Sequence, residues 1–548
     1  MRPRNVLYPS HFCLFFVFSI MPKKSLWLTA LVCGAFLPGQ VHARQVQAAG
    51  PVIDSIAIYT QNVFGVREAQ SNIAFKFANA IRIKTQRGVV QRELLFDVGD
   101  QYDSASVAES ARNLRALGIF QWVTIDTVRL EEGLTVVVQT ADTWSTQLQI
   151  GGGSDGGVFT WQLGGVETNF LGGGSRAGAV FYKEVDRNRW RFGLQTNRLF
   201  GSKVALGVSY DDLSDGDSMF WSLSAPFRSF SDKFSWELVG ERADQQILQF
   251  VHRDAGNLQS VSFWRRAFVN RAAVAFAPVA NTAEYVRVGA MGIVRRQEIV
   301  SLADTALAVP DSVTAAVGAF VEYRKARFRV VRHFSGFARQ EDLDVGTALR
   351  LSLWFAPSAF GYESTGMGSR VELNTALSFP NGFARLGVAA TALFNGAGLD
   401  SGRVRGSATI AVQPLTRQAT FVHVEAGMQK NVFPGSEFDL GHARGPRGFG
   451  PHTFVGDRTV WGTLEHRVFL ADNFADLFGI GFAGFVDYGG AWFAGSSRQV
   501  GGSIGGGLRL GMSRASARNV ARLDLSHLFG DGWTNKRWVV SFGRGFAF

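Results

Sequence analysis

Apolar residues alternate with small or polar residues along most of the chain, from about residue 144 to residue 548. A period of two places successive side chains on opposite faces of a β-strand, so each such stretch predicts a strand with one apolar face. Examples of these apolar faces are Val204, Leu206, Val208 and Tyr210 in one stretch, Val371, Leu373, Thr375, Leu377 and Phe379 in a second, and Trp538, Val540 and Phe542 in a third.

Residues 52–141 show a different pattern, which predicts a small α/β domain. Residues 52–58 form an apolar strand pattern, and residues 120–128 and 134–139 predict two more strands around a turn. Between them, Asp103 and Ser104 can cap a helix whose apolar positions follow the helical period, and Gly118 can end it. A short mixed sheet of this kind leaves exposed edges, which can take an added strand from a partner.

Composition distinguishes a membrane-embedded β-protein from other classes. Glycine (63) and phenylalanine (47) are abundant, charged residues make up 18%, and the mean hydropathy is +0.05. The chain is therefore too apolar to be disordered. Beyond residue 44 it also lacks an uncharged stretch of the roughly 18 residues that a membrane-spanning helix needs. A soluble β-sandwich alternates too, but repeated apolar faces without separate domains favour an all-β transmembrane barrel over residues 144–548.

The length of this region gives an estimate of the strand number. The barrel segment has 548 − 143 = 405 residues. At roughly 25 residues for a strand and its connection, it would hold about 16 antiparallel strands, with roughly 14 or 18 as alternatives. A barrel of that size has a wide polar lumen, which must be filled unless the protein is an open pore.

The first 43 residues have the features of a signal peptide. Lys23 and Lys24 precede the apolar stretch 26–37, and residues 41–43 form a small-residue cleavage site. Translation could start at Met1 or at Met21, and an N-terminal membrane anchor is the alternative interpretation. Both cysteines, Cys13 and Cys33, lie in this segment, so we expect an exported protein without disulfides.

Charge and motifs argue against several function classes. Four of the positive charges lie in the signal segment, so the formal charge of +11 falls to 11 − 4 = +7 for the remainder. No basic run with interleaved aromatics occurs, and we expect no nucleic-acid partner. The sequence has no P-loop or H-E-x-x-H motif, and its G-x-G-x-x-G and G-x-S-x-G matches lie in glycine-rich β-structure. We therefore expect no cofactor, no metal site and no enzymatic activity.

Two strand patterns and one loop contain the candidate site residues. In the strand over residues 478–489, Asp487 falls on the lumen face, and in residues 460–470 Glu465 and Arg467 fall on the lumen face with Thr463. A long glycine- and proline-containing loop with Arg447 lies between predicted strands. Arginine is suited to hold a carboxylate with two parallel hydrogen bonds, which would anchor such a loop inside the barrel. The alternative is an exposed loop arginine.

These residues resemble the signatures of the BamA-type outer-membrane assembly and translocation superfamily, the bacterial surface antigen family. The loop 441–449 has the core Arg447-Gly448-Phe449, and Phe485-Val486-Asp487-Tyr488-Gly489 resembles a strand motif of that family. The resemblance implies that Arg447 contacts Asp487, with Glu465 and Arg467 nearby. Residues 52–141 resemble a POTRA domain, although this chain has one such unit where the bacterial assembly factor has several.

The last residues of the chain resemble a barrel-targeting signal. Gly543, Phe546 and Phe548 supply a glycine followed by two spaced aromatics at the end of a predicted strand. The alternative is a last strand with no further role. Arg544 interrupts the lipid-facing pattern and could extend toward the membrane surface.

The resemblance implies an outer-membrane protein of a Gram-negative-type bacterium with its N-terminal domain in the periplasm. Client polypeptides would bind at the POTRA sheet edge, and the barrel would insert or export them, with energy from client folding. The partners would be clients, outer-membrane lipids, and periplasmic chaperones or lipoproteins. The alternatives are a passive or gated outer-membrane pore or lipid-handling channel, and an outer-membrane lipase or protease.

Each function class predicts a different feature of the barrel. An assembly factor predicts a weak seam between the first and last strands, and a pore predicts a large unplugged conductance. An enzyme predicts a convergent Ser/His/acid cluster, which the sequence does not reveal.

Overall fold

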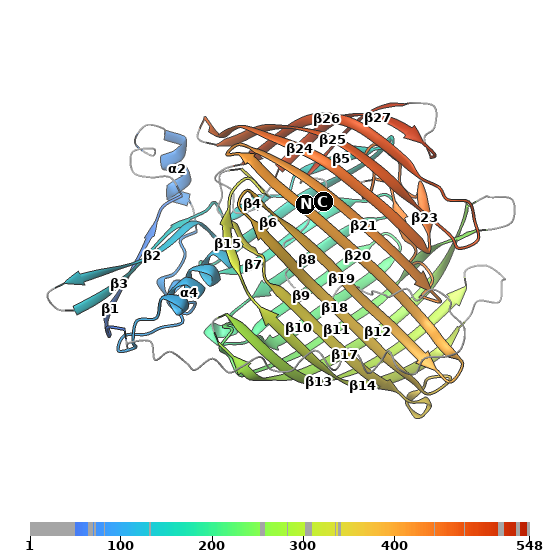
Figure 1. Cartoon of the computed structure of the whole chain (residues 1–548), viewed down its shortest axis with the longest axis horizontal. Helices are drawn as coiled ribbons and strands as arrows, with labels where there is room; N and C mark the ends of the chain where they lie inside the picture. Colours follow the sequence, from blue (N-terminus) through green and yellow to red (C-terminus); the bar gives the residue numbers. More distant parts are fainter. Residues whose placement is uncertain are drawn as a thin grey trace.

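The computed structural model describes residues 50–544, apart from gaps at 64–69, 71–72, 82, 131–132, 253–257, 282, 302–308, 335, 338–340, 443, 476, 513–519 and 533–536. An N-terminal α/β unit lies beside one end of a closed β-barrel (Figure 1). We call the barrel end next to this unit the proximal end and the opposite end the distal end. The predicted signal peptide, Phe546 and Phe548 lie outside the described residues.

The α/β unit has a three-stranded sheet in the order β1-β3-β2, in which β1 is parallel and β2 antiparallel to β3. Asp103 caps α4 as predicted, because its carboxylate accepts hydrogen bonds from the backbone N–H groups of Ala105 and Ser106. Within the described residues, β1 and β2 each pair on one side only, so both are edge strands. The elements are β1 (Ile53–Gln61), α2 (Ile73–Ile81), α3 (Arg87–Gln91), α4 (Ser104–Ala116), β2 (Phe120–Leu130) and β3 (Gly133–Asp142).

The barrel wall consists of 20 antiparallel strands in the described part of the chain, because β4 and β5 both pair with β6 and form one interrupted strand. The wall strands are β4 (Thr146–Leu148), β5 (Gly151–Asp155), β6 (Val158–Phe170), β7 (Ser175–Lys183), β8 (Asn188–Thr196), β9 (Ala205–Leu213), β10 (Gly216–Ala225), β11 (Phe234–His252), β12 (Leu258–Ala280), β13 (Glu284–Ser301), β14 (Val309–Lys325), β17 (Thr347–Ala356), β18 (Gly366–Phe379), β19 (Gly382–Asn395), β20 (Gly398–Leu415), β21 (Gln418–Lys430), β24 (Arg458–Phe474), β25 (Phe478–Trp492), β26 (Gly501–Met512), β27 (Val520–Gly530) and β28 (Trp538–Arg544).

The prediction of about 16 strands is therefore wrong. That prediction assumed roughly 25 residues for each strand with its connection. The strands β7, β8 and β9 have only 9 residues each, and β10 has 10. A two-residue turn, Ser214 and Asp215, joins β9 to β10. Short strands and tight hairpins place more strands in the same length of chain.

The wall has an apolar outer face and a more polar lumen, as the alternation predicts. On β24, Val460 and Leu464 are exposed on the outer face, whereas Thr459, Thr463 and Glu465 on the opposite face are buried. An apolar outer belt is the arrangement of a barrel embedded in lipid. None of the described helices is long and apolar enough to cross a membrane.

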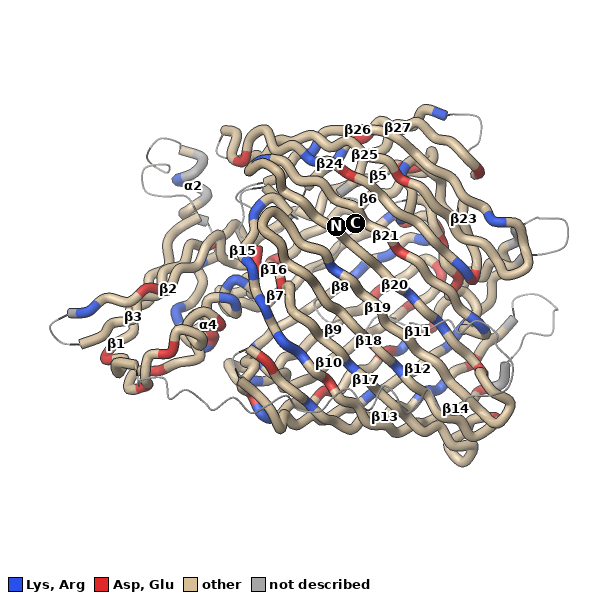
Figure 2. The backbone as a smooth tube through the Cα atoms, in the orientation of Figure 1, with Lys and Arg blue, Asp and Glu red and all other residues tan. Residues whose placement is uncertain are grey.

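Arginine dominates the lumen face of the strands from β12 to β20. By the same alternation, ten arginines and two glutamates of these strands face the lumen, which gives 10 − 2 = +8. Figure 2 shows Lys and Arg positions along this part of the wall. The residues are Arg265, Arg271, Arg287, Arg295, Arg324, Arg350, Arg370, Arg385, Arg403 and Arg405, with Glu322 and Glu372.

Hydrogen bonds join the α/β unit to the proximal end of the barrel. The backbone N–H of Gln86 donates to the carbonyl of Gly172 in the β6–β7 turn at 3.0 Å. Glu93 accepts from Arg198 Nε at 2.8 Å. Glu109 of α4 accepts from the backbone N–H of Phe230 at 2.9 Å. The unit is thus fixed to several turns of the wall.

Two long connections between wall strands form small hairpins of their own. The connection 431–457 contains β22 (Phe438–Leu440) paired with β23 (Phe454–Gly456), and we call it the distal loop. The connection 326–346 contains β15 (Phe328–Val331) paired with β16 (Glu341–Asp344), and we call it the proximal hairpin.

Candidate functional site: an arginine-anchored loop in the barrel lumen

The distal loop folds into the lumen and packs on the inner wall. Phe449 and Phe454 of the loop form a buried cluster with Trp461 and Leu528 of the wall. Gly448 has a φ of +87°, and a Cβ at this position would lie 2.8 Å from the Leu528 side chain. Only glycine satisfies both the left-handed backbone and the close approach to the wall.

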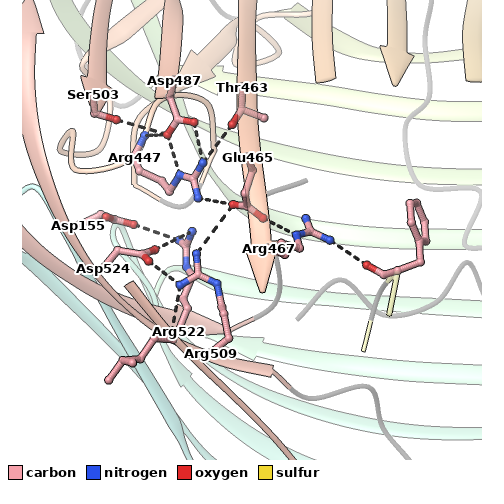
Figure 3. A network of polar contacts seen from close by, with 12 residues as sticks. Asp155, Arg447, Thr463, Glu465, Arg467, Asp487, Ser503, Arg509, Arg522 and Asp524 are labelled. Atoms are coloured by element: carbon pink, nitrogen blue, oxygen red, sulfur yellow. Dashed lines mark hydrogen bonds and ion pairs between the residues drawn. The ribbon is translucent and has the colours of Figure 1, made fainter. Parts of the chain in front are cut away.

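Arg447 is the residue through which the loop binds the lumen wall (Figure 3). Its Nε and Nη2 donate to the two carboxylate oxygens of Asp487 at 2.7 Å each, and its backbone N–H donates to Asp487 Oδ2 at 3.0 Å. Its Nη1 donates to Glu465 Oε2 at 2.6 Å, and Nη2 also donates to Thr463 Oγ1 at 3.0 Å. The guanidinium carbon lies 3.4 Å from the centre of the Phe485 ring. Every donor group of this side chain therefore has a partner.

Neighbouring strands contribute three more arginines to the same polar network. Arg467 donates through Nε to Glu465 Oε1 at 2.5 Å, and Arg509 donates through Nη1 to Asp524 Oδ1 at 2.5 Å. These arginines lie on β24, β26 and β27, and Figure 3 shows them converging on Glu465 and Asp524. The complete set is Arg447, Arg467, Arg509 and Arg522 with Asp155, Glu465, Asp487 and Asp524, each at most 8% exposed.

This network is electrically balanced, since four arginines face four carboxylates. Buried charges are tolerated only when they are paired and hydrogen-bonded. Removing one charge would leave the remaining seven with a net charge of one unit inside the barrel. The network therefore makes the position of the distal loop sensitive to each of its members.

The last wall strand, β28, closes the barrel against the interrupted first strand formed by β4 and β5. Only one residue pair, Phe542 with Ser154, joins β28 to β5 in the described part of the chain. The distal loop lies across this seam, because Gly448 N–H donates to Asp155 of β5 at 3.3 Å while Gly448 also approaches Leu528 of β27.

A second polar contact holds the outer part of the distal loop. His452 Nδ1 lies 2.6 Å from Asp439 of β22, and Nε2 lies 3.0 Å from Asp186 in the β7–β8 connection. The imidazole also packs 4.6 Å from the Phe250 ring centre. Hydrogen bonds to Asp186 and Asp439 raise the pKa of His452 from 6.5 to about 10. The imidazolium is therefore the stable form at neutral pH.

The structure brings together Arg447, Gly448, Phe449, Asp487, Glu465 and Arg467, which the sequence analysis named as one group. Gly543 is separate from them on β28, where a Cβ would lie 3.2 Å from Arg522 Nε. The sequence analysis did not include Asp155, Thr463, Ser503, Arg509, Arg522 and Asp524 in the site. The alternation places Arg509 on the lumen side of β26, and Arg522 and Asp524 on that side of β27, so strand parity was the available signal.

The described residues contain no group of three or more His, Cys, Asp or Glu side chains that could hold a metal ion.

Comparison with known proteins gives one sequence match and several distant structural ones. No family model matches the chain. The outer membrane protein assembly factor BamA of Neorickettsia risticii (strain Illinois) is 30% identical over 129 residues, which span 23% of this chain and 17% of that protein. BamA from Haemophilus ducreyi, in a structure lacking POTRA domains 1–3, has a TM-score of 0.40 at 12% identity and covers 90% of this chain and 85% of its own.

Two further structures are similar at the same level. CdiB from Acinetobacter baumannii has a TM-score of 0.41 at 12% identity, covering 91% of this chain and 74% of its own. CdiB from Escherichia coli has a TM-score of 0.44 at 10% identity, covering 93% and 92%. The sequence match thus joins a small part of this chain to a small part of an outer-membrane assembly factor.

Proposed function

We propose that this protein inserts client polypeptides into the outer membrane or exports them across it. In this proposal the α/β unit, residues 52–141, is a POTRA domain in the periplasm, and the proximal end of the barrel faces the same compartment. The edge strands β1 and β2 support client capture by strand addition, because their outer backbone groups are free of ladder partners within the described residues. Periplasmic chaperones or lipoproteins would be additional partners.

The junction of the first and last wall strands, which the distal loop bridges on the lumen side, is the observation that carries this proposal. The backbone ladder at this junction must separate for the barrel to open between its first and last strands. Phe542 pairs with Ser154 at this junction, and Gly448 of the distal loop contacts both sides of it, through Asp155 of β5 and Val539 of β28. An opening there would offer two strand edges to a client strand inside the membrane. A passive pore is less consistent with the lumen, since the distal loop occupies it through a buried cluster and a balanced charge network.

Disulfide cross-links can test whether the seam must open. Ser154→Cys with Phe542→Cys joins the two seam strands at their register pair. Leu525→Cys with Val540→Cys joins β27 to β28 at an outward-facing pair and serves as the matched control. Each pair brings two Cα atoms to the separation that a disulfide can bridge.

The assay adds a small unfolded outer-membrane barrel protein to proteoliposomes that contain the purified variant. We expect the oxidised seam variant to lose client insertion and to regain it after reduction, while the control variant is active in both states. Full insertion by the oxidised seam variant would contradict the proposal.

A further inference from the structure

The proximal hairpin is long for a connection at its end of the barrel. It has 346 − 325 = 21 residues between β14 and β17. Nearby, Pro380 and Asn381 alone join β18 to β19, and Thr416 and Arg417 alone join β20 to β21. Arg329 of β15 fixes the hairpin to one of these turns, because its guanidinium donates to the carbonyls of Phe379, Pro380 and Gly382 at 2.9–3.1 Å. Arg329 therefore fixes the described part of the hairpin to the barrel.

Phe337 of this hairpin inserts into a glycine-lined site in the lumen wall. The side chain is 5% exposed. A Cβ added at Gly479, Gly481 or Gly511 would lie 2.3, 3.3 or 2.4 Å from the Phe337 ring. Glycine within a strand costs stability and marks a place where another part of the chain approaches closely. The wall strands β25 and β26 thus leave room for this one aromatic ring.

Other aromatic contacts continue around Phe337. Phe337 packs edge-on against Phe469 at a ring separation of 5.3 Å. Phe334 packs against Phe383 and Phe421 at 5.1 and 5.3 Å. These wall residues come from β19, β21 and β24, and they form one buried cluster with the hairpin. Apolar contacts therefore join the hairpin to a continuous run of wall strands from β19 to β27 at the proximal end.

The hairpin is also joined to the α/β unit. Arg115 of α4 donates from Nε and Nη2 to the two carboxylate oxygens of Asp342 on β16, at 2.6 and 2.9 Å. The guanidinium of Arg112, one turn earlier, lies 4.4 Å from the Phe328 ring centre on β15. Two-pronged arginine–carboxylate contacts fix orientation as well as distance. A movement of α4 is thus transmitted to the hairpin.

The same hairpin contacts the network that holds the distal loop. Arg467 donates through Nη1 to the backbone carbonyl of Phe334 at 2.8 Å and through Nε to Glu465. Glu465 in turn accepts from Arg447. A continuous chain of polar contacts therefore runs from the proximal hairpin to the distal loop, through one buried carboxylate.

We propose that the proximal hairpin is a built-in plug that closes the proximal end of the lumen and that the α/β unit controls it through Arg115 and Asp342. The lumen then has two closures in series, the distal loop and this hairpin, and Arg467 joins them. Displacement of the α/β unit would withdraw Phe337 from its glycine-lined site. The proposal goes beyond client insertion and requires no client for its test.

Thiol labelling of a buried wall position measures whether the plug is seated. Ala419 of β21 is 0% exposed and lies in the cluster that the hairpin covers, so Ala419→Cys is the reporter. The reagent is a membrane-impermeant maleimide, applied to the purified full-length protein in detergent. Phe337→Ala empties the glycine-lined site, and Asp342→Arg breaks the contact with α4. Val330→Ala is the matched control, because Val330 lies on β15 of the same hairpin but is 54% exposed.

We expect at least tenfold faster labelling in Phe337→Ala and Asp342→Arg, and unchanged labelling in Val330→Ala. Combining Asp342→Arg with Arg115→Asp recreates the ion pair with reversed charges and should restore slow labelling. Heat-modifiable migration on gels checks that every variant retains the folded barrel. Labelling of Phe337→Ala at the rate of the unaltered protein would overturn the plug. Failure of the charge-reversed pair to restore slow labelling would overturn control by the α/β unit.

Discussion

Removal of the Arg447 side chain should release the distal loop from the lumen wall. Arg447→Ala deletes the donors to Asp487, Glu465 and Thr463. It also leaves the buried network with three arginines and four carboxylates, a net charge of −1. Asp487→Ala produces the opposite imbalance, and the double variant restores equality with three charges of each sign. The two single changes should therefore be strongly coupled.

The free-energy cost of removing Arg447 depends on the contacts that its carboxylate partners keep. Removing one member of a buried ion pair costs about 3–5 kcal/mol. Without Arg447, Glu465 keeps its contact with Arg467, and Asp487 keeps Ser503 and the backbone N–H of residue 447. We therefore expect the lower value, about 3 kcal/mol, which raises the fraction of released loop on the order of 100-fold. The double variant should be no worse than either single variant.

A cysteine beneath the loop can report this equilibrium. Ser526 is 0% exposed, its hydroxyl has no hydrogen-bond partner among the described residues, and its Cβ lies 3.5 Å from a Cβ built at Gly448. Ser526→Cys should therefore be nearly neutral, and its maleimide labelling rate should follow the released fraction. Arg444→Ala, which removes an exposed arginine of the same loop, is the matched control.

We expect roughly 100-fold faster labelling in Arg447→Ala and Asp487→Ala, and little change in Arg444→Ala. Arg447→Lys should remain partly released, because an ammonium keeps the charge but cannot make the two parallel bonds. Client insertion in proteoliposomes should fall in parallel while the barrel stays assembled. Additive losses near 6 kcal/mol in the double variant, or slow labelling in Arg447→Ala, would refute the reasoning.

Four further predictions concern other parts of the chain. Phe548→Asp, or deletion of residues 546–548, should abolish outer-membrane levels of the protein, as measured in fractionated membranes, because the change removes an aromatic of the predicted barrel-targeting signal. A proline at Tyr59 in edge strand β1 should weaken photo-cross-linking to clients without unfolding the α/β unit, and cross-linking that survives deletion of that unit would show it to be a spacer. Because the pKa of His452 is raised, the stability that this residue adds to the distal loop is complete below about pH 6.5 and is lost as the pH rises through about 10. Hydrogen exchange of the loop, corrected for its intrinsic pH dependence, should therefore become faster over that range. In His452→Phe the corrected rate should not depend on pH. The lumen face of β12–β20 has a charge of 10 − 2 = +8. The double variant Arg447→Ala/Phe337→Ala, in which both the distal loop and the proximal hairpin are released, should therefore conduct chloride better than potassium in planar bilayers. A cation-selective reversal potential would contradict this.

Strand periodicity predicts the class of fold because it depends on local chemistry alone. Each wall strand must present apolar side chains to lipid and smaller or polar ones to the lumen, and this requirement is repeated at every second residue. The number of strands depends instead on the length of each connection. Residues such as Ser214 and Asp215 form a complete turn, and an average length per strand cannot reveal where such tight hairpins occur.

The loop residues could be grouped from the sequence only in part. Asp487, Glu465 and Arg467 have the parity of lumen-facing positions, and the resemblance to a known motif implies that Arg447 meets Asp487. Arg509 and Asp524 have the same parity, but an arginine on a lumen face can equally line a water-filled wall. These two residues belong to the buried network only because the distal loop covers them. Burial by a segment distant in the sequence does not change the local alternation of apolar and polar residues, so the sequence does not reveal it.

The contact between the proximal hairpin and the wall could not be predicted from the sequence either. Gly479, Gly481 and Gly511 suit a barrel strand for many reasons, and neither their number nor their spacing identifies the ring that fills the space above them. Phe337 by itself suits the outer face of a strand equally well. Phe337 can be matched with these three glycines only from the strand register, which places them together on β25 and β26 at the proximal end, where the hairpin enters. Large substitutions at Gly511 should therefore resemble Phe337→Ala in the Ala419→Cys labelling assay, since the first displaces the ring from its site and the second removes it, and both leave the outer belt of the barrel intact.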